Sequence, residues 1–403
     1  MTSTTTRPPA GAPDAEPRRS GLTARVVLGK VFAPVPSEFL LIASTALLLT
    51  GFGLVMVLSA TSAVGTANGD APYESLIKQS VFAVIGIPLM FIASRFTIGF
   101  WKRMAWPVLI GATAFQMLVF TPLGVDNDGN TNWIKIAGLQ AQPSEFLKLA
   151  LALWMGYVLF RKQTLLGLWR HVFIPVVPVS VAVMATVLAG HDLGTVSILV
   201  LVVLAALFFS GVKLRIFVIP LILAAGALVA FAVTSPNRMG RIMSFLDPVC
   251  TDYYNACYQP LHGIWGLASG GVFGLGLGNS KQKYDWLPAA SSDYIFSIVG
   301  EEMGMIGCCV VLLLFALFAV GAFHIVRKTD DPFVRIVAGA ITVWIVGQAL
   351  LNVAVVLRLA PALGVPLPFM SQGGTSLVSV LIACGVLLSF ARTIPTRTTA
   401  AGR

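Results

Sequence analysis

The chain has 403 residues, of which 57% are hydrophobic and only 11% are charged, and its formal net charge is +10. Soluble domains carry about 25% charged residues, so this composition excludes an ordinary water-soluble protein and indicates a chain that crosses a membrane repeatedly. A nucleic-acid partner would also suit the positive charge, but the basic residues gather in loops between apolar segments, as membrane topology requires.

Residues 1–37 are rich in Pro, Thr and Ala and lack the apolar core of a signal peptide, so we predict a disordered tail. Residues 393–403 form a second short tail. Between them, apolar windows are about as long as a membrane span requires. The prediction for 38–392 is therefore an all-α membrane domain of ten spans, at roughly 39–59, 79–95, 104–121, 144–160, 172–189, 193–210, 214–234, 293–325, 334–357 and 373–391.

Most Lys and Arg residues fall in the first tail and in the loops after every second predicted span. The positive-inside rule then places both termini in the cytoplasm. Segments 122–143, 235–292 and 358–372 would lie outside, with 235–292 as the large extracellular loop. Because irregular backbone at membrane depth must be buried in protein or line water, we expect the working surface on the outer face.

Two polar groups precede the large loop. Glu145 and Lys148 are three residues apart and share a helix face after Pro143. The spacing is compatible both with an ion pair that orients the span and with a lysine that meets an anionic substrate. Asp192 stands at the start of a predicted helix, where the interpretation as an N-terminal cap is favoured.

The glycine-rich segment 261–288 contains no GxxxxGK[ST] sequence, so it is no P-loop. Lys281, Lys283 and Asp285 follow the glycines, and they suit either a phosphate-binding hairpin or a solvated turn. Segment 358–376 is rich in Pro and Gly and resembles a cavity-lining turn. Its polar side chains could bind sugar or phosphate or only cap the last helix, and they include Ser371, Gln372 and Thr375.

Three acids, Asp293, Glu301 and Glu302, open the predicted eighth span. An acid in a membrane helix is a functional-site candidate. Asp293 lies at the outer mouth, whereas Glu301 lies about 12 Å deeper along a helix. We predict a functional role for Asp293 and a structural role for the two glutamates.

Cys250 and Cys257 are seven residues apart in the large outer loop, where an oxidising exterior permits a disulfide. We predict that they are bridged. The other cysteines fall in helices and suit small core positions, and the absence of a CxxC pair leaves a zinc site without support.

Several sequences occur in order along the chain: GLVMVLSA, NWIKIAGLQAQPSEFLKL, HDLGT, GLGLGNSKQKYDWLP, SDYIFSIVGEEMG and PLPFMSQGGTS. Together they resemble the SEDS family (shape, elongation, division and sporulation) over about 39–392, and GNSKQK and GLVMVLSA resemble its cell-division branch. The resemblance implies a multi-pass cell-membrane enzyme at the division septum, a peptidoglycan glycosyltransferase that polymerises lipid II. It also implies a class B penicillin-binding protein and other divisome proteins as partners.

By the same resemblance, Asp293 matches the family's essential acid and is expected to act as the general base. A divalent cation, Mg²⁺ or Mn²⁺, or the Lys148 ammonium would stabilise the diphosphate leaving group. Positions associated with activity or substrate contact fall on Glu145, Lys148, Asp192, Lys283 and Asp285.

The chain departs from the family in three places. LPAASSD replaces the usual LPEAHTD, SQGGTS replaces a run like SYGGSS, and Arg358 stands where Gly is common. Secondary roles of the missing Glu and His therefore do not transfer to this chain. Two alternatives stay open: a lipid II flippase, since many spans with intramembrane charges suit a transporter, and a noncatalytic division scaffold.

Overall fold

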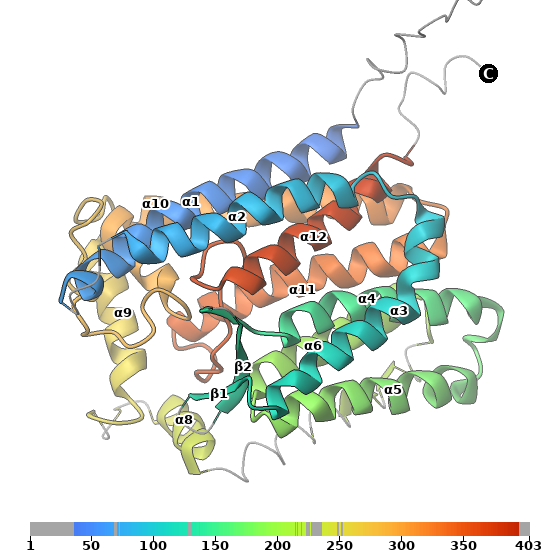
Figure 1. The fold of residues 1–403 in the computed structure, drawn as a ribbon, viewed down its shortest axis with the longest axis horizontal. Helices are drawn as coiled ribbons and strands as arrows, with labels where there is room; N and C mark the ends of the chain where they lie inside the picture. Colours follow the sequence, from blue (N-terminus) through green and yellow to red (C-terminus); the bar gives the residue numbers. More distant parts are fainter. Residues whose placement is uncertain are drawn as a thin grey trace, which may run out of the picture. The chain divides into compact units, whose positions relative to one another are not determined.

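The protein is described by a computed structural model that covers most of the predicted membrane domain (Figure 1). The described residues are 36–67, 71, 73–127, 130–136, 138–213, 215, 217–218, 220–222, 226, 236–247, 250 and 253–394. Both predicted tails, apart from their inner ends, and most of the predicted span 214–234 lie outside these residues.

Long helices form most of the described structure, as predicted. Some of them start at a side-chain cap: Thr97 accepts a hydrogen bond from Phe100 N before the helix Ile98–Met117, and Asp331 accepts one from Phe333 N before the helix Pro332–Val356. The helices are α1 (Ser37–Ala67), α2 (Glu74–Ala93), α3 (Ile98–Met117), α4 (Ser144–Arg161), α5 (Trp169–Ala189), α6 (Leu193–Phe209), α10 (Ile295–Lys328), α11 (Pro332–Val356) and α12 (Gly374–Ala391). Short 3₁₀ turns follow α3 and α4, at Leu118–Phe120 and Gln163–Leu165.

Seven helices among the described residues are long and apolar enough to cross a membrane. Two further predicted spans form helices of a different character. Helix α6 is apolar but has 17 residues, and α4 carries Glu145, Lys148 and Arg161. The number of ten spans stays a prediction, because the remaining segment falls largely outside the described part of the chain.

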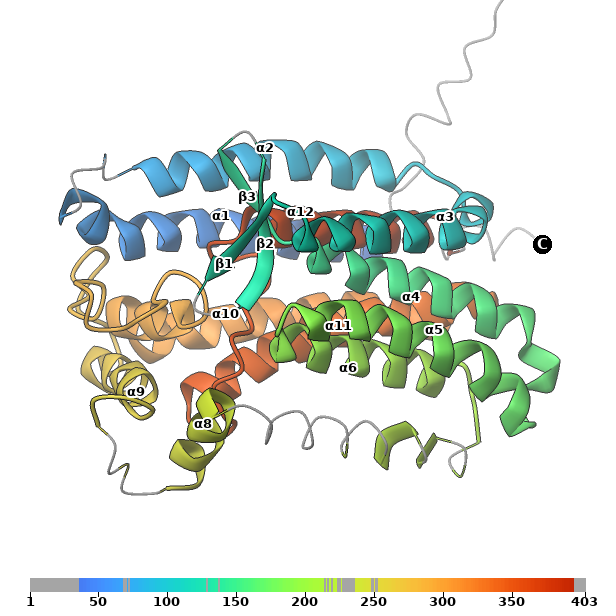
Figure 2. The same cartoon turned by 60° about the horizontal axis from the view of Figure 1, so that its bottom comes forward.

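The long helices run side by side, with α12 packed against α2 and α1, and α11 packed against α10, α6 and α4 (Figures 1 and 2). Helix α1 begins at the same end of the bundle at which α10 and α12 finish. At that end Lys328 Nζ donates to Glu38, and the Arg392 guanidinium lies 4.8 Å from the centre of the Phe39 ring.

Shorter elements lie toward the opposite end of the bundle (Figures 1 and 2). They are α8 (Pro236–Leu246), α9 (Tyr258–Gly270) and an antiparallel sheet in the order β1-β2-β3, made of Gly124–Asn127, Asn130–Ile136 and Leu139–Ala141. Segment 122–143, which was predicted as an outer segment of an all-α domain, therefore contains a small sheet that the prediction missed. The strands are short, and Gly138 turns the chain between β2 and β3 with a φ of 83°, which glycine adopts readily.

Helix α10 is broken near its start, at Gly304, whose φ is 66°. The loop that follows α9 fills the break: Leu275 N donates to Glu301 O, and Met305 N donates to Gly271 O, each at 2.9 Å. A β-carbon on Gly304 would lie 2.4 Å from Gly274 N, so only glycine fits there. The predicted eighth span was too long for one straight helix, and this break accounts for its length.

Candidate active site

Asp293 lies two residues before α10, in a half-buried turn outside the helix. Its backbone is held from two sides, because its N–H donates to Ala289 O at 3.1 Å and its carbonyl accepts from Asn352 Nδ2 at 2.6 Å. Its Oδ2 lies beside Gly364, where an added β-carbon would be 3.6 Å away. No described residue donates a hydrogen bond to the carboxylate, so the backbone of Asp293 is held in place while its carboxylate is free of donors within the described part of the chain.

The electrostatic surroundings of Asp293 favour proton exchange near neutral pH. Burial raises the pKa of Asp293 to about 6; the positive charge of Arg241 opposes this increase and the negative charge of Asp192 adds to it. A general base is most effective when its pKa is near the working pH. Asp293 is therefore suited to accept a proton.

Asp192 caps α6, as its position in the sequence predicts. Its Oδ1 accepts from Thr195 N at 2.8 Å, and its Oδ2 accepts from Thr195 Oγ1 at 2.7 Å and Gln142 Nε2 at 3.0 Å. Burial raises the pKa of this carboxyl as well. Its hydrogen bonds occupy both oxygens, so Asp192 influences Asp293 by charge while it holds α6 in place.

Glu145 and Lys148 form a closed ion pair inside α4. Their charged atoms are 2.7 Å apart and both side chains are 1% exposed. Lys148 Nζ also donates to Gln348 Oε1 at 3.1 Å and lies 5.4 Å from the centre of the Trp344 ring. Of the two interpretations that the spacing left open, this arrangement matches the orienting ion pair, and a substrate would have to displace these partners to reach the ammonium.

Lys283 is likewise buried, and it lies in the loop that docks on α10. Its Nζ donates to Gly278 O at 2.5 Å and is 3.8 Å from Glu302 Oε1. Glu302 accepts from Ser59 Oγ at 2.6 Å, and Glu301 accepts from Lys281 N at 2.9 Å. The two glutamates thus fasten the loop and α1 to α10, which is the structural role expected of them.

Of the four remaining candidate residues, one has no hydrogen bond among the described residues and three are hydrogen-bonded within the protein. Asp285 is exposed, has a φ of 62° and makes no hydrogen bond within the described residues. Ser371 Oγ donates to Ser292 O at 2.5 Å, and Gln372 Oε1 accepts from Ser291 Oγ at 2.7 Å. Thr375 Oγ1 accepts from Gln142 N at 2.9 Å. The contacts of Ser371 and Gln372 hold the turn before Asp293 in place. The contact of Thr375 holds Gln142, which in turn donates to Asp192.

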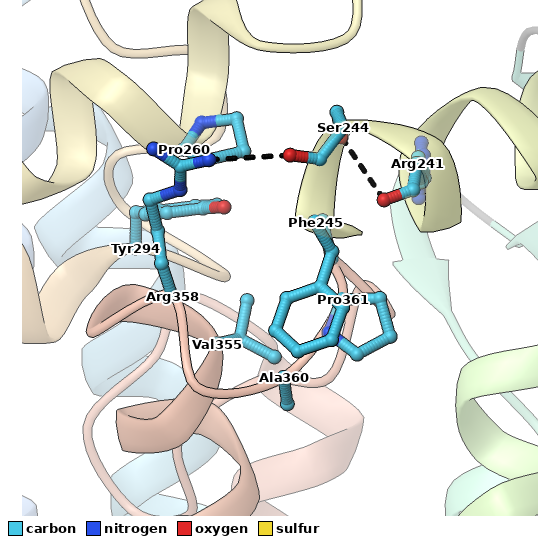
Figure 3. A pocket seen from close by; sticks show the side chains of 10 residues that line it. Arg241, Ser244, Phe245, Pro260, Tyr294, Val355, Arg358, Ala360 and Pro361 are labelled. Atoms are coloured by element: carbon cyan, nitrogen blue, oxygen red, sulfur yellow. Dashed lines mark hydrogen bonds between the residues drawn. The ribbon is translucent and has the colours of Figure 1, made fainter. Parts of the chain in front are cut away.

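A small cavity lies next to Tyr294, the residue that follows Asp293 in the chain (Figure 3). Arg241 and Ser244 of α8 line one wall, and Arg358 lines another. Arg358 Nη2 donates to Ser244 O and Asp247 O at 3.2 Å each and lies 3.2 Å from Cys250 Sγ. The structure joins Cys250 to Cys257 as a disulfide, which closes the chain between α8 and α9 next to this cavity.

The family described as "Cell cycle protein" (FtsW/RodA/SpoVE) matches residues 39–394. The chain belongs to the FtsW/RodA/SpoVE family. A probable peptidoglycan glycosyltransferase FtsW of Geobacter sp. (strain M18) is 36% identical over 345 residues, which are 85% of this chain and 94% of that protein. The resemblance that the ordered sequence motifs indicated is thereby confirmed.

Solved structures of the family share the fold. One chain, from a study of the "structural coordination of polymerization and crosslinking by a peptidoglycan synthase complex", is 25% identical with a TM-score of 0.65, over 84% of this chain and 97% of that chain. The Rod shape determining protein RodA of Thermus thermophilus is 20% identical with the same TM-score, over 91% of this chain and 99% of RodA.

The sequence of this FtsW/RodA/SpoVE protein did not reveal that Arg241 and Tyr294 line the same cavity. Arg241 was only one of several outer basic residues, and nothing in its spacing indicates that α8 folds back toward Asp293. Arg358 did carry a signal, since it departs from the family's usual Gly. Its φ of 55° lies in the left-handed region, where a side chain is disfavoured unless the surroundings hold it.

Proposed function

We propose that the chain is a peptidoglycan glycosyltransferase that polymerises lipid II into glycan strands at the outer face of the cell membrane, during septal wall synthesis. The observation that carries this proposal is Asp293, a half-buried acid with a fixed backbone and a carboxylate that has no donor among the described residues. The name of the FtsW relative supports the activity.

In the proposed reaction, one lipid II presents the 4-hydroxyl of its GlcNAc as the acceptor, and the lipid-linked glycan is the donor. Asp293 takes the proton of this hydroxyl as the oxygen attacks the anomeric carbon of the donor. The bond from that carbon to the diphosphate breaks, and the configuration inverts. A pKa of about 6 leaves Asp293 mostly ionised at neutral pH, as a base must be.

The proposed topology keeps both termini in the cytoplasm, with ten spans and an extracellular 235–292 loop. It is supported by the start of α1 and the end of α12 lying at one end of the bundle, together with Lys328 and Arg392. Basic residues at the cytoplasmic ends of spans are what the positive-inside rule expects. Asp293, α8 and α9 would then lie outside.

The proposed protein partner is a class B penicillin-binding protein, within a larger division assembly. The structural relative from a peptidoglycan synthase complex, in which polymerization and crosslinking are coordinated, supports this proposal. A polymerase that works beside a transpeptidase delivers its glycan directly to the crosslinking enzyme.

A divalent cation, Mg²⁺ or Mn²⁺, is part of the proposal only as an ion shared with substrate. Within the described residues no three His, Cys, Asp or Glu side chains gather into a ligand set. Mg²⁺ is often held by one or two carboxylates together with substrate phosphates. A cation here would neutralise diphosphate charge, and the proton transfer assigned to Asp293 does not depend on it.

The test is a reconstitution with fluorescent lipid II in vesicles, using wild type and Asp293→Ala, with and without the transpeptidase and Mg²⁺ or Mn²⁺. We expect glycan strands from wild type and none from Asp293→Ala. Translocated lipid without strands would favour the flippase instead. Strands in equal yield from both proteins would remove Asp293 from the mechanism, and a scaffold would give neither strands nor translocation.

A further inference from the structure

The segment that follows α9, which we call the apolar loop (residues 271–277), exposes apolar side chains next to the break in α10. Phe273 is the most exposed of them, at 81%. The other exposed apolar side chains of the loop are Val272, Leu275 and Leu277. Residues 253–280 contain no Asp, Glu, Lys or Arg. An exposed apolar cluster of this kind marks a surface that contacts a membrane or another apolar molecule.

The backbone of the apolar loop is hydrogen-bonded to the broken part of α10. The carbonyls of Gly271 and Val272 accept from the backbone N–H groups that follow Gly304, at 2.9 and 3.3 Å. The N–H groups of Leu275 and Gly276 donate to backbone carbonyls that precede Gly304, at 2.9 Å each. The loop and the helix thus satisfy one another's polar groups at the point where both are irregular.

Further backbone groups of the apolar loop are satisfied close by. Gly274 N donates to Gly270 O at 2.8 Å. Asn279 donates twice, from Nδ2 to Leu275 O at 3.0 Å and from its backbone N to Gly276 O at 3.2 Å. A loop in water has no need of protein partners for its backbone, whereas irregular backbone at membrane depth is tolerated only when protein supplies them.

The length of α10 beyond its break indicates the depth of the apolar loop. From Met305 to Lys328 the helix extends about 36 Å at 1.5 Å per residue, and the hydrocarbon core of a bilayer is about 30 Å thick. Arg327 and Lys328 end the helix, and basic residues of this kind lie at the headgroups. The other boundary of the hydrocarbon core then falls close to Gly304, which is the level of the apolar loop.

The exposed face of α10 continues the surface of the apolar loop. Helix α10 is long and apolar enough to cross a membrane, and its exposed side chains beyond the break include Met305, Ile306 and Leu313. Ile306 N is one of the groups that donate to the loop, and Figure 2 shows the segment after α9 alongside the start of α10. Lipid that covers this face of α10 therefore reaches the apolar loop.

The residues around the apolar loop have the composition of a membrane interface. Trp265 of α9 precedes it, and Tyr284 and Trp286 follow it, all three with exposed rings. Lys281, also exposed, is the first charged residue after the loop. Trp and Tyr are enriched where the hydrocarbon core meets water, and Lys reaches from there to the headgroups.

We propose that the apolar loop inserts its side chains among the lipid acyl chains at the edge of the bilayer. In the proposed topology this is the outer leaflet, so residues 271–277 enter the membrane while the rest of segment 235–292 stays outside. The inference needs that topology only to name the leaflet, and it does not depend on glycosyl transfer. Insertion of an apolar surface to this depth anchors the adjoining segment to the bilayer.

The experiment measures which phase surrounds Phe273. Full-length protein in which Cys308 and Cys309 are replaced by Ala is placed in nanodiscs of phosphatidylethanolamine and phosphatidylglycerol. A nitroxide is attached at Phe273→Cys, and its relaxation by oxygen, which concentrates in hydrocarbon, is compared with that by a nickel chelate, which stays in water. Leu313→Cys on the exposed face of α10 is the lipid reference, and Tyr254→Cys, 85% exposed in the outer segment, is the aqueous reference.

We expect the ratio of oxygen to nickel accessibility at Phe273→Cys to be several-fold higher than at Tyr254→Cys and within about twofold of that at Leu313→Cys. Leu277→Cys is a second position in the loop and decides if Phe273→Cys lowers the unfolding temperature. The same protein without an added cysteine measures any labelling of Cys384, which is buried.

Two results would overturn the proposal. A ratio in the loop equal to that at Tyr254→Cys would place the apolar loop in water. Low accessibility to both reagents would mean that protein, such as a second copy of this chain, covers the loop in place of lipid. Inactivity of the same preparation toward lipid II would count against the proposed function and would leave the measured depth of the loop unchanged.

Discussion

Asp293 and the pair Glu301 and Glu302 lie within ten residues of one another, yet their surroundings differ completely. Glu301 and Glu302 accept hydrogen bonds from Ser59 and from the loop that docks on α10, and Glu302 also faces Lys283. The carboxylate of Asp293 has no such donor among the described residues. In a low-dielectric setting an acid with hydrogen-bond donors stabilises structure, whereas an acid without them, on a backbone that is held in place, is available for chemistry.

The sharpest way to break this comparison is to neutralise Asp293. Asp293→Asn keeps the shape and the backbone contacts to Ala289 and Asn352 but removes the base, so polymerisation of lipid II should fall by about 10²–10⁴-fold. The unfolding temperature should stay within a few degrees of wild type, because the carboxylate has no protein donor to lose. Gel separation of fluorescent glycan products measures the rate.

Asp330→Asn is the matched control, since Asp330 is exposed in the turn between α10 and α11. It should polymerise lipid II like wild type. A rate for Asp293→Asn within threefold of this control would show that the free carboxylate is not the base.

Neutralising Glu302 should produce the opposite pattern. Glu302→Gln leaves the Lys283 ammonium buried without its counter-ion, and breaking a buried pair in this way costs about 3–5 kcal/mol. The protein should unfold at a clearly lower temperature in detergent, and the folded fraction should retain most of its polymerase activity. A double variant, Glu302→Gln with Lys283→Met, should recover part of the lost stability.

Normal stability of Glu302→Gln, together with a large loss of rate in well-folded protein, would contradict the structural role. In that case the presence or absence of hydrogen-bond donors would not distinguish a structural acid from a catalytic one in this molecule.

Hydrophobic periodicity was enough to find most of the fold. The predicted spans 144–160 and 193–210 became α4 (Ser144–Arg161) and α6 (Leu193–Phe209) because apolar runs of that length can bury their backbone only as helices. The same reasoning missed the sheet at 124–141. Strands this short derive their stability from pairing with one another, which windows of about 20 residues cannot detect.

The site was only partly predictable for a related reason. Asp293 could be identified because an acid next to a membrane span is conspicuous, and Asp192 because a cap has a local signature. The partners of Lys148 and Lys283 could not, since Gln348 lies 200 residues from Lys148 along the chain and Gly278 contributes only a backbone carbonyl. Side chains that the sequence offered for substrate, such as Ser371, are occupied by contacts that only the fold creates.

Removal of the disulfide should increase the mobility of α8 and of the segment before α9. The loop that Glu301 and Glu302 hold against α10 should stay unchanged. Cys250→Ser with Cys257→Ser opens a loop of sequence separation seven, and loops of this size are stabilised by about 2–3 kcal/mol when bridged. Hydrogen exchange should become faster in α8 and the segment before α9, while the loop at 271–283 keeps its protection. Equal exchange in both regions, before and after the change, would show that the bridge does not restrain this wall of the cavity.

The smallest expected effect is the pH dependence of kcat/KM, which the titration of Asp293 should control. Burial raises its pKa to about 6, so the ionised base is lost as the pH falls through that value. Below the midpoint kcat/KM should fall about tenfold per pH unit, which corresponds to about 1.4 kcal/mol. Two charged groups act on the midpoint: Arg241 lowers the pKa and Asp192 raises it, so Arg241→Gln should move the midpoint upward. Glu302→Gln should leave the midpoint unchanged, and a flat profile from pH 5 to 8 in protein that stays folded would mean that the free acid does not control the rate.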